Sequence, residues 1–253
     1  MANLVEKKLS FELGPALGGD TSFGLIVLQA DETIEQDIRR LLPNSSSALY
    51  SSRIPSGTEV TCETLAKMEE DITETVRLFP TAVSFSVVGY GCTSATSVIG
   101  VKKIRDFISK GCNTAAVTEP VSALLASCKA LEVNKIAFLS PYVEEVSATL
   151  RRVLEENGLE ISVFGTFDEA NESNVARITP TSSAKAVFEL VQGTSAEAVF
   201  MSCTNLQTLD IIEDIENALA IPVLSSNLVL AWHMLELAGF KEKKPDFGRL
   251  MKK

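Results

Sequence analysis

Short apolar runs alternate along the chain with longer segments in which apolar residues recur every three or four positions. The runs FGLIVL, KIAFLS and EAVFMS are typical of buried strands, and the longer segments are typical of helices. We expect strands at 23–28, 47–53, 82–88, 113–118, 135–140, 160–166, 197–202 and 221–225. We expect helices at 33–42, 61–79, 95–110, 120–132, 142–157, 181–193, 207–219 and 227–239. This order predicts an α/β fold of mostly parallel sheets flanked by helices.

The order of elements repeats along the chain. FGLIVL and KIAFLS each open a strand-helix-strand-helix-strand run that ends at a cysteine turn. Gly24 and Ile136 are 112 positions apart, and Cys92 and Cys203 are 111 apart. This nearly constant offset predicts two pseudo-symmetric lobes with the active site in the cleft between them. We assign 23–120 plus 226–240 to the first lobe and 121–225 to the second.

Residues 1–22 and 241–253 are then extensions at the N- and C-terminus. The last stretch, KEKKPDFGRLMKK, is charged and contains a proline. We expect it to be a solvated tail.

Cys92 and Cys203 each follow an apolar strand and precede a polar turn that leads into a helix. A thiolate is the reactive form of cysteine, and a neighbouring helix N-terminus lowers the thiol pKa. One such cysteine is more often a buried packing residue, but two on matched turns favour chemistry. The turns also supply donors that could hold a substrate carboxylate, namely Thr93 and Ser94 in one and Thr204 and Asn205 in the other.

The other three cysteines fit the sequence pattern as packing residues. Cys62 and Cys128 fall within helical patterns, and Cys112 begins a strand instead of ending one. The total of five is odd, and the opening residues do not have the pattern of a secretory signal. We therefore expect free thiols and a cytoplasmic protein.

Composition and sequence motifs restrict the classes of partner and cofactor. A net charge of -10 argues against nucleic acid or an anionic membrane as the main partner, whereas a small anion needs only local positive potential. No apolar run approaches the roughly 20 residues that span a bilayer. The motif GYGCTS has serine where a dinucleotide fingerprint has its third glycine, and the single histidine, His233, lies in an apolar helix. We expect no nucleotide cofactor and no metal.

The two cysteine turns, the two-half layout and the SSN after the last strand resemble the aspartate/glutamate racemase superfamily. Within it they resemble the branch of maleate cis-trans isomerases and arylmalonate decarboxylases, over about Phe23 to Phe240. The resemblance implies cofactor-independent chemistry, with Cys92 and Cys203 on opposite sides of a substrate carbon. In the racemases one thiolate removes an α-proton and the other thiol delivers one. In the isomerases the first-half cysteine adds to a double bond, and the decarboxylases use only the second-half cysteine.

The resemblance also suggests substrate contacts. Tyr142 matches a tyrosine that binds a substrate carboxylate in this branch. Asp31 stands about where maleate isomerases have an asparagine. A carboxylate there would repel a dicarboxylate unless it is protonated or turned away. It could instead pair with a substrate ammonium, or it could cap the helix that begins near Thr33.

Further polar residues lie near the ends of expected strands. Asn171 and Asn174, in the loop DEANESNVARI, are candidate amide contacts, although asparagine-rich loops are also common turns. Thr118 and Ser226 end the strands that follow each cysteine helix, where their hydroxyls could line the cleft.

The sequence therefore predicts an isomerase or racemase of a small carboxylic or amino dicarboxylic acid with a two-cysteine mechanism. Both thiols are present, which disfavours arylmalonate-type decarboxylation and leaves it as the alternative. A non-catalytic carboxylate-binding protein is the second alternative. The sequence leaves open whether the chain works as a monomer or a homodimer.

Overall fold

Two separate parallel sheets form the frame of the molecule. The computed structural model describes residues 6–17, 19, 21–43, 47–241 and 244–253. The first sheet has the strand order β2-β1-β3-β4 and the second has the order β6-β5-β7-β8. The strands of the first are β1 (Ser22–Leu28), β2 (Ala48–Ile54), β3 (Phe85–Gly91) and β4 (Thr114–Thr118). Those of the second are β5 (Lys135–Ser140), β6 (Glu160–Thr166), β7 (Ala198–Met201) and β8 (Val223–Ser225). The matching orders confirm the predicted α/β fold with a repeated layout.

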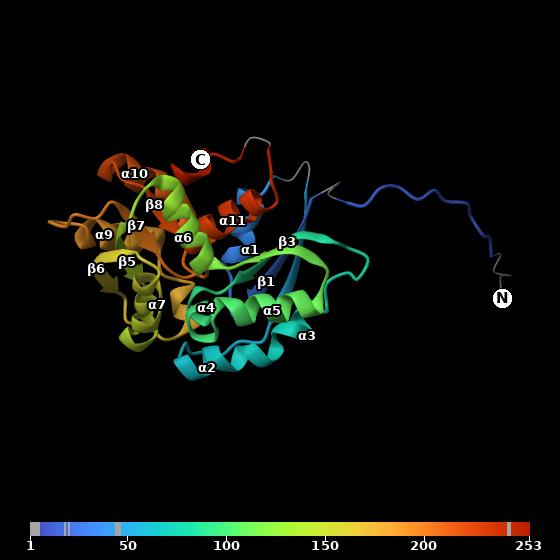
Figure 1. Ribbon diagram of the computed structural model, residues 1–253, viewed down its shortest axis with the longest axis horizontal. Helices are drawn as coiled ribbons and strands as arrows, with labels where there is room; N and C mark the ends of the chain where they lie inside the picture. The colour runs from blue at the N-terminus through green and yellow to red at the C-terminus, as the bar shows by residue number, and fades with distance from the viewer. Residues whose placement is uncertain (1–5, 18, 20, 44–46, 242–243) are drawn as a thin grey trace, which may run out of the picture.

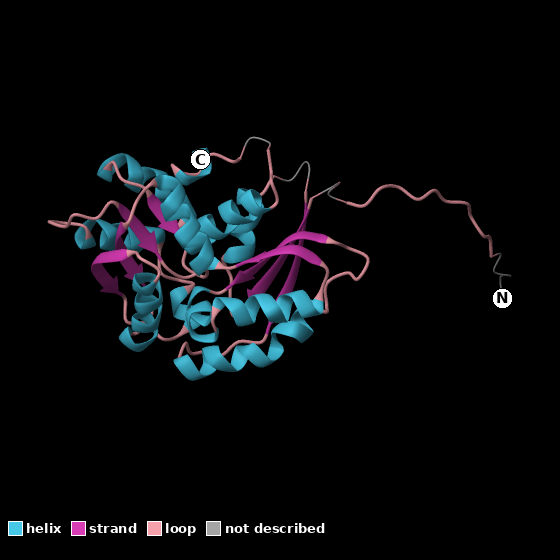
Figure 2. Cartoon of the chain, viewed as in Figure 1, coloured by secondary structure: helices cyan, strands magenta, loops and turns pink. Residues whose placement is uncertain are grey.

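Helices connect and cover these strands (Figures 1 and 2). The first half contains α1 (Ile34–Leu41), α2 (Cys62–Lys67), the 3-10 helix η1 (Met68–Asp71), α3 (Ile72–Val76), α4 (Thr93–Ile99), α5 (Val101–Gly111) and α6 (Pro120–Leu131). The second half contains α7 (Glu144–Glu156), α8 (Glu172–Val175), α9 (Pro180–Leu190), η2 (Leu209–Ile211), α10 (Ile212–Leu219), α11 (Ser226–Leu237) and η3 (Leu250–Lys252). Within the described ranges, no helix is long and apolar enough to cross a membrane.

Both faces of the first sheet are buried. Along β1, Phe23 and Leu25 join one apolar cluster and Ile26 and Leu28 join another. Successive side chains of a strand point to opposite faces, so a continuous apolar run suits a strand that is covered on both sides. Helices α2, α3 and α5 cover one face, and α1 and α11 cover the other (Figure 1).

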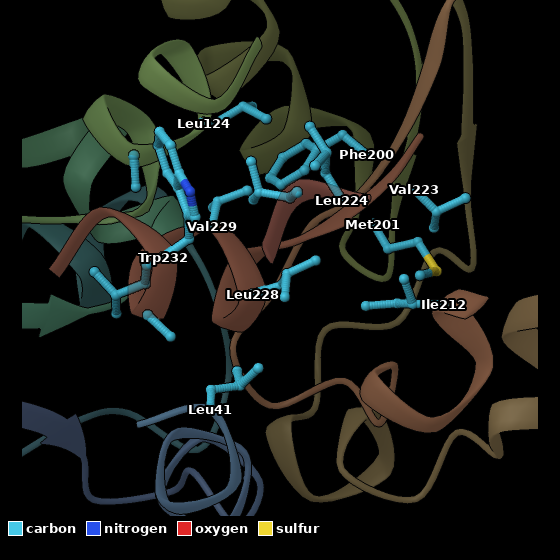
Figure 3. Close-up of a cluster of buried hydrophobic side chains, with 14 of the residues drawn as sticks. Leu41, Leu124, Phe200, Met201, Ile212, Val223, Leu224, Leu228, Val229 and Trp232 are labelled. Atoms are coloured by element: carbon cyan, nitrogen blue, oxygen red, sulfur yellow. The ribbon is translucent and has the colours of Figure 1, made fainter. Parts of the chain in front are cut away.

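Helices α6 and α11 connect the two sheets. Figure 3 shows Leu124 of α6 near Phe200 of β7, while Val229 and Trp232 of α11 lie in the same cluster. Helix α11 follows β8 of the second sheet yet packs on β3 of the first, where the site of a Cβ on Gly89 would lie 2.8 Å from Met234 Sδ. The division in which 226–240 joins the first lobe and 121–225 forms the second stays a prediction.

Several element boundaries differ from the prediction. Strand β3 begins and ends three residues later than expected, because GYG continues the strand instead of forming a turn. The expected helix 61–79 is interrupted by η1, and the expected helix 95–110 is two helices that meet at Gly100. Gly100 has φ +96°, in the left-handed region that favours glycine.

The two terminal extensions differ in their contacts. Residues 1–5, 18, 20 and 242–243 lie outside the described residues, and 6–17 extend away from the body (Figure 1). The expectation of a solvated C-terminal tail is wrong for 244–253. Leu250 is fully buried and Met251 is 4% exposed, because η3 packs against α6 and α11. Burial of these two apolar side chains packs the segment against the body despite its charged residues.

Candidate functional site

A small cavity lies at the carboxyl ends of strands from both sheets. It brings together eight of the nine residues predicted as catalytic or substrate-binding, together with two others. The lining residues are Leu28, Asp31, Cys92, Thr93, Ser94, Tyr142, Glu172, Cys203, Thr204 and Asn205. Parallel strands that end at a common cleft are where ligands bind in open α/β folds.

The Cys92 turn leads directly from β3 into α4. Cys92 is the N-cap of α4, and its Sγ accepts a hydrogen bond from the Ala95 backbone N–H at 3.3 Å. Gly91 precedes it because a side chain there would collide with β1: a Cβ would lie 2.8 Å from the carbonyl oxygen of Ile26. The strand end is therefore packed tightly, and this packing fixes the position of the cysteine.

The Cys203 turn differs from the prediction. No helix begins directly after Cys203, because η2 starts only at Leu209. Instead, Sγ accepts a hydrogen bond from the Asn205 backbone N–H at 3.2 Å, and the Tyr142 hydroxyl lies 2.9 Å away. Cys203 also has φ +102°, a backbone conformation that is strained for a residue with a side chain. Such strain is concentrated at functional sites.

The thiol pKa values also differ from the prediction of lowered values. Burial raises the pKa of Cys92 to about 12, and the charges of Glu172 and Asp31 act in the same direction. Burial likewise raises the pKa of Cys203 well above its usual value, and the charge of Glu172 adds to this effect. Single N–H donors do not offset the loss of water around the sulfur. Both shifts favour the neutral thiol over the thiolate.

Glu172 is the main residue at the site that sequence reasoning missed. It is 5% exposed. Its Oε1 accepts a hydrogen bond from the Tyr142 hydroxyl at 2.7 Å, and its Oε2 accepts one from Asn205 Nδ2 at 2.9 Å. Burial raises the pKa of Glu172, and these two hydrogen bonds oppose the rise. A continuous hydrogen-bonded chain therefore runs from the Cys203 sulfur through Tyr142 to a carboxylate.

Asp31 lines the cavity and also has the capping contact considered from the sequence. Its Oδ1 accepts hydrogen bonds from the backbone N–H groups of Thr33 and Ile34, both at 2.8 Å, as a residue that caps the start of α1 would. Its Oδ2 has no hydrogen-bond partner among the described residues. Burial raises the pKa of Asp31 against the effect of the two backbone donors.

Asn174, predicted as a substrate contact, lies outside the cavity. It is exposed and its Nδ2 donates to Glu169 Oε2 at 2.9 Å. The short helix α8 turns Glu172 inward and Asn174 outward. Asn171 accepts hydrogen bonds from the backbone of α8 as its N-cap. Both asparagines therefore have local structural contacts.

Thr118 and Ser226 are buried behind the cavity and do not line it. The Thr118 hydroxyl lies 2.7 Å from His233 Nδ1. The Ser226 oxygen accepts hydrogen bonds from the Thr93 hydroxyl at 2.8 Å and the Cys203 backbone N–H at 3.0 Å. Ser226 thus joins the two cysteine turns. The remaining cysteines, Cys62, Cys112 and Cys128, are free thiols and lie elsewhere.

The cavity is small. Its volume is about 10 Å³, about enough for one water molecule. Residues 57–61 and 169–172 meet through backbone hydrogen bonds, from Val60 N–H to Ala170 O and from Glu172 N–H to Thr58 O. Glu32 and Arg177 also form an ion pair at 2.8 Å. A substrate with several carbon atoms therefore requires the cavity to widen.

A larger pocket of about 380 Å³ lies next to this cavity. Its lining includes Glu32, Thr33 and Gln207 but neither of the two cavity thiols. We place the candidate chemistry in the smaller cavity for this reason. Across the part of the chain that the structure describes, no group of three or more His, Cys, Asp or Glu side chains is arranged to hold a metal ion.

Comparison with known proteins identifies similar chains. The family model described as arylmalonate decarboxylase matches residues 60–251, more than half of the chain. A maleate isomerase from Nocardia farcinica is 25% identical over 245 residues, which cover 92% of this chain and 96% of that protein. An arylmalonate decarboxylase from Bordetella bronchiseptica is 26% identical over 239 residues, covering 90% and 95%.

A solved structure has a similar fold. It is a variant of the Nocardia farcinica maleate cis-trans isomerase with a covalently bound succinylcysteine intermediate. The two chains superpose with a TM-score of 0.80 at 23% identity, over 91% of this chain and 98% of that one. At this identity the likeness shows the fold.

Proposed function

We propose that this chain, which belongs to the arylmalonate decarboxylase family, is an isomerase or racemase of small carboxylic acids that works without a cofactor through Cys92 and Cys203. The observation that carries this proposal is that both thiols line one cavity, each contributed by a different sheet. Two groups on separate walls can act on opposite faces of one substrate carbon. That arrangement suits inversion at the carbon.

Glu172 and Tyr142 give the thiol proton of Cys203 a path. The proton moves from Cys203 Sγ to the Tyr142 oxygen while Tyr142 passes its own proton to Glu172 Oε1, over distances of 2.9 and 2.7 Å. Cys203 becomes a thiolate, Tyr142 stays neutral and Glu172 becomes an acid. Burial raises the pKa of Glu172, which makes its carboxylate a better proton acceptor than a solvated glutamate.

Racemisation then requires removal of a proton from one face of the substrate carbon and delivery of a proton to the other face. The Cys203 thiolate removes the α-proton, and the Cys92 thiol delivers a proton to the opposite face. Backbone N–H groups and the hydroxyls of Thr93, Ser94 and Thr204 would hold the substrate carboxylate and the charge that it gains in the planar intermediate. One turnover leaves Cys203 as a thiol and Cys92 as a thiolate, the state that inverts the opposite enantiomer. The starting state returns when Cys92 takes a proton from solvent and Glu172 releases to solvent the proton that it accepted.

Cis-trans isomerisation could use the same pair of thiols. One sulfur would add to the double bond, the single bond would rotate, and the sulfur would leave again. The succinylcysteine in the Nocardia farcinica isomerase structure supports this version for that fold.

Proton NMR in heavy water tests the proposal with aspartate, glutamate, maleate and substituted malonates. A racemase exchanges the α-proton for deuterium and inverts the carbon, and an isomerase interconverts maleate and fumarate. We expect Cys92→Ala and Cys203→Ala each to lower kcat by at least about 10²-fold on the best substrate. Cys62→Ala removes a thiol outside the cavity and serves as the matched control. Full turnover by both cavity variants would refute the two-thiol mechanism.

Decarboxylation of a substituted malonate is the second candidate. The matched family model and the relative from Bordetella bronchiseptica favour it. Loss of carbon dioxide leaves a carbanion that needs only one proton donor. For this function we expect release of carbon dioxide that survives Cys92→Ala and is lost in Cys203→Ala. Dependence on both thiols favours the isomerase instead.

A further inference from the structure

The cavity is unusual in its charge. Asp31 is 3% exposed and Glu172 is 5% exposed, and both line it together with the two thiols. Among the described residues that line the cavity, none is Lys, Arg or His. A buried carboxylate without a cation is strongly unfavourable. A positive charge from outside the protein would relieve this cost.

The two carboxylates differ in what they can still bind. Both oxygens of Glu172 have partners, because Tyr142 donates to Oε1 and Asn205 donates to Oε2. Asp31 uses Oδ1 to cap the start of α1, and its Oδ2 is buried without a partner. The Thr204 hydroxyl, which lowers the pKa of Asp31, donates to the Gly91 carbonyl oxygen at 3.3 Å, so Asp31 Oδ2 is a buried carboxylate oxygen without a partner.

Arg53, which binds the backbone of Asp31, forms no ion pair with this oxygen. Arg53 Nη1 donates to the carbonyl oxygens of Leu28, Gln29 and Asp31, at 3.0, 3.2 and 3.0 Å. Arg53 Nη2 pairs with Glu35. The guanidinium thus binds the backbone of the loop and another carboxylate. Its charge adds only a general attraction for Asp31.

We propose that Asp31 Oδ2 binds a positively charged nitrogen of the substrate, so that the preferred substrates are small carboxylic acids that also carry an ammonium group. The proposal rests on the proposed function, because it assumes that the substrate occupies the thiol cavity. Burial raises the pKa of Asp31, the two backbone N–H groups on Oδ1 oppose the rise, and a bound ammonium group would further favour the ionised carboxylate. The substrate carboxylate would meet the neutral donors of the cavity.

Paired ligands test this subsite by binding. The probes are aspartate with succinate and glutamate with glutarate, which differ only in the ammonium group. Calorimetry on the full chain carrying Cys203→Ala measures binding without turnover. We expect the ammonium-bearing member of a pair to bind at least about tenfold more tightly. Equal or tighter binding of the deaminated acid would overturn the proposal, because it would mean that Asp31 is protonated or turned away.

A second experiment replaces the Asp31 carboxylate with an isosteric amide. Asp31→Asn, in the same Cys203→Ala background, should abolish the preference for the ammonium-bearing acid. Asp37→Asn is the matched control, because Asp37 is also buried but does not line the cavity. The Asp37→Asn variant should keep the preference for the ammonium-bearing acid. If Asp31→Asn keeps it too, the subsite is refuted.

The two proposals fail in different ways. Loss of turnover in the cysteine variants with no discrimination between paired acids would retain the thiol mechanism and remove the ammonium subsite. Discrimination that depends on Asp31, together with full turnover in the cysteine variants, would retain the subsite and remove the mechanism.

Discussion

The hydroxyl of Thr93 donates a hydrogen bond of 2.8 Å to the hydroxyl of Ser226, and the same oxygen accepts the backbone N–H of Cys203 at 3.0 Å. Thr93 directly follows Cys92. One fully buried serine at the start of α11 therefore ties the turn of one cysteine to the turn of the other. In the proposed mechanism, the relative position of the two thiols depends on this side chain.

Ser226→Ala should affect both stability and turnover. It leaves two buried donors without an acceptor, so we expect the free energy of unfolding to fall by about 1–3 kcal/mol. We expect kcat to fall by about tenfold, because small misplacements of reacting groups are costly. Urea unfolding and steady-state kinetics measure the two effects.

Ser225→Ala is the matched control. Ser225 caps the same helix by accepting the Leu228 backbone N–H at 3.2 Å, and its side chain forms no hydrogen bond with either cysteine turn. We expect it to lower the free energy of unfolding by about 1 kcal/mol and to leave kcat unchanged. Equal losses of kcat in both variants would show that Ser226 acts only through general stability.

The repeated fold could be predicted because it depends on local patterns. Strands β5 and β6 have the predicted bounds, since each apolar run is flanked by clear helical and turn signals. Strand β3 was misplaced because glycines usually mark turns, whereas Gly91 is inside a strand to allow close approach of β1. This close approach of β1 to Gly91 is visible only in the folded structure, so the sequence pattern did not predict it.

The candidate site could be predicted only in part. The cysteine turns stand out because they recur at a fixed offset. Glu172 does not stand out, because a glutamate in an acidic, asparagine-containing loop is typical of a solvent-exposed residue. Its burial depends on Tyr142 and Asn205, which are 30 and 33 positions away. The raised thiol pKa values were missed for a similar reason, since desolvation comes from distant segments.

Tyr142→Phe should slow the reaction and move its pH profile. The variant loses the hydrogen bond that lowers the pKa of Cys203, so that pKa rises further above its usual value. Formation of the thiolate then requires a higher pH, and the rate should rise at more alkaline pH than in the wild type. We expect kcat near neutral pH to fall by at least about tenfold. An unchanged profile would contradict the proposed proton path.

Glu172→Gln should shift the pKa of the Cys203 thiol in the opposite direction. Loss of the Glu172 charge removes an interaction that raises the pKa of Cys203, so alkylation of Cys203 by iodoacetamide should begin at lower pH. Turnover should nevertheless fall, because the proton acceptor is gone. Alkylation is measured in the Cys92→Ala background, which leaves one thiol in the cavity, and turnover is measured in proteins that keep Cys92. Alkylation and turnover that change together would argue against Glu172 as the acceptor.

Gly91→Ala should disturb the Cys92 turn. The added Cβ would lie 2.6 Å from Ile34 Cδ1 and 2.8 Å from the Ile26 carbonyl oxygen, and the backbone oxygen cannot move without shifting β1. We expect a loss of about 1–3 kcal/mol in the free energy of unfolding, together with a lower kcat. Gly89→Ala, on the same strand, meets the flexible Met234 side chain and should cost less. A Gly91→Ala protein with wild-type stability and turnover would contradict this packing argument.

Asp37 should make stability depend on pH. Burial raises its pKa from 3.8 to about 6, against the hydrogen bond from Asn227 Nδ2 at 2.8 Å. The folded protein therefore binds a proton at Asp37 more tightly than the unfolded chain does. The stabilisation is fully present below pH 4 and is lost as the pH rises through 6. A shift of about two pH units corresponds to about 3 kcal/mol.

Asp37→Asn isolates this contribution, because its side-chain oxygen can still accept the hydrogen bond from Asn227 while no longer titrating. Urea unfolding of both proteins at pH 4.5, 5.5 and 7.5 measures the effect. We expect the stability of the variant relative to the wild type to increase from pH 4.5 to 7.5, by about 2 kcal/mol. Other buried carboxyl groups, such as Glu119 and Glu216, titrate in both proteins and cancel in the difference. A difference that does not vary with pH would show that Asp37 stays ionised in the folded protein at all three values. The carboxylate would then be stabilised by Asn227 and Arg40 more than burial disfavours it.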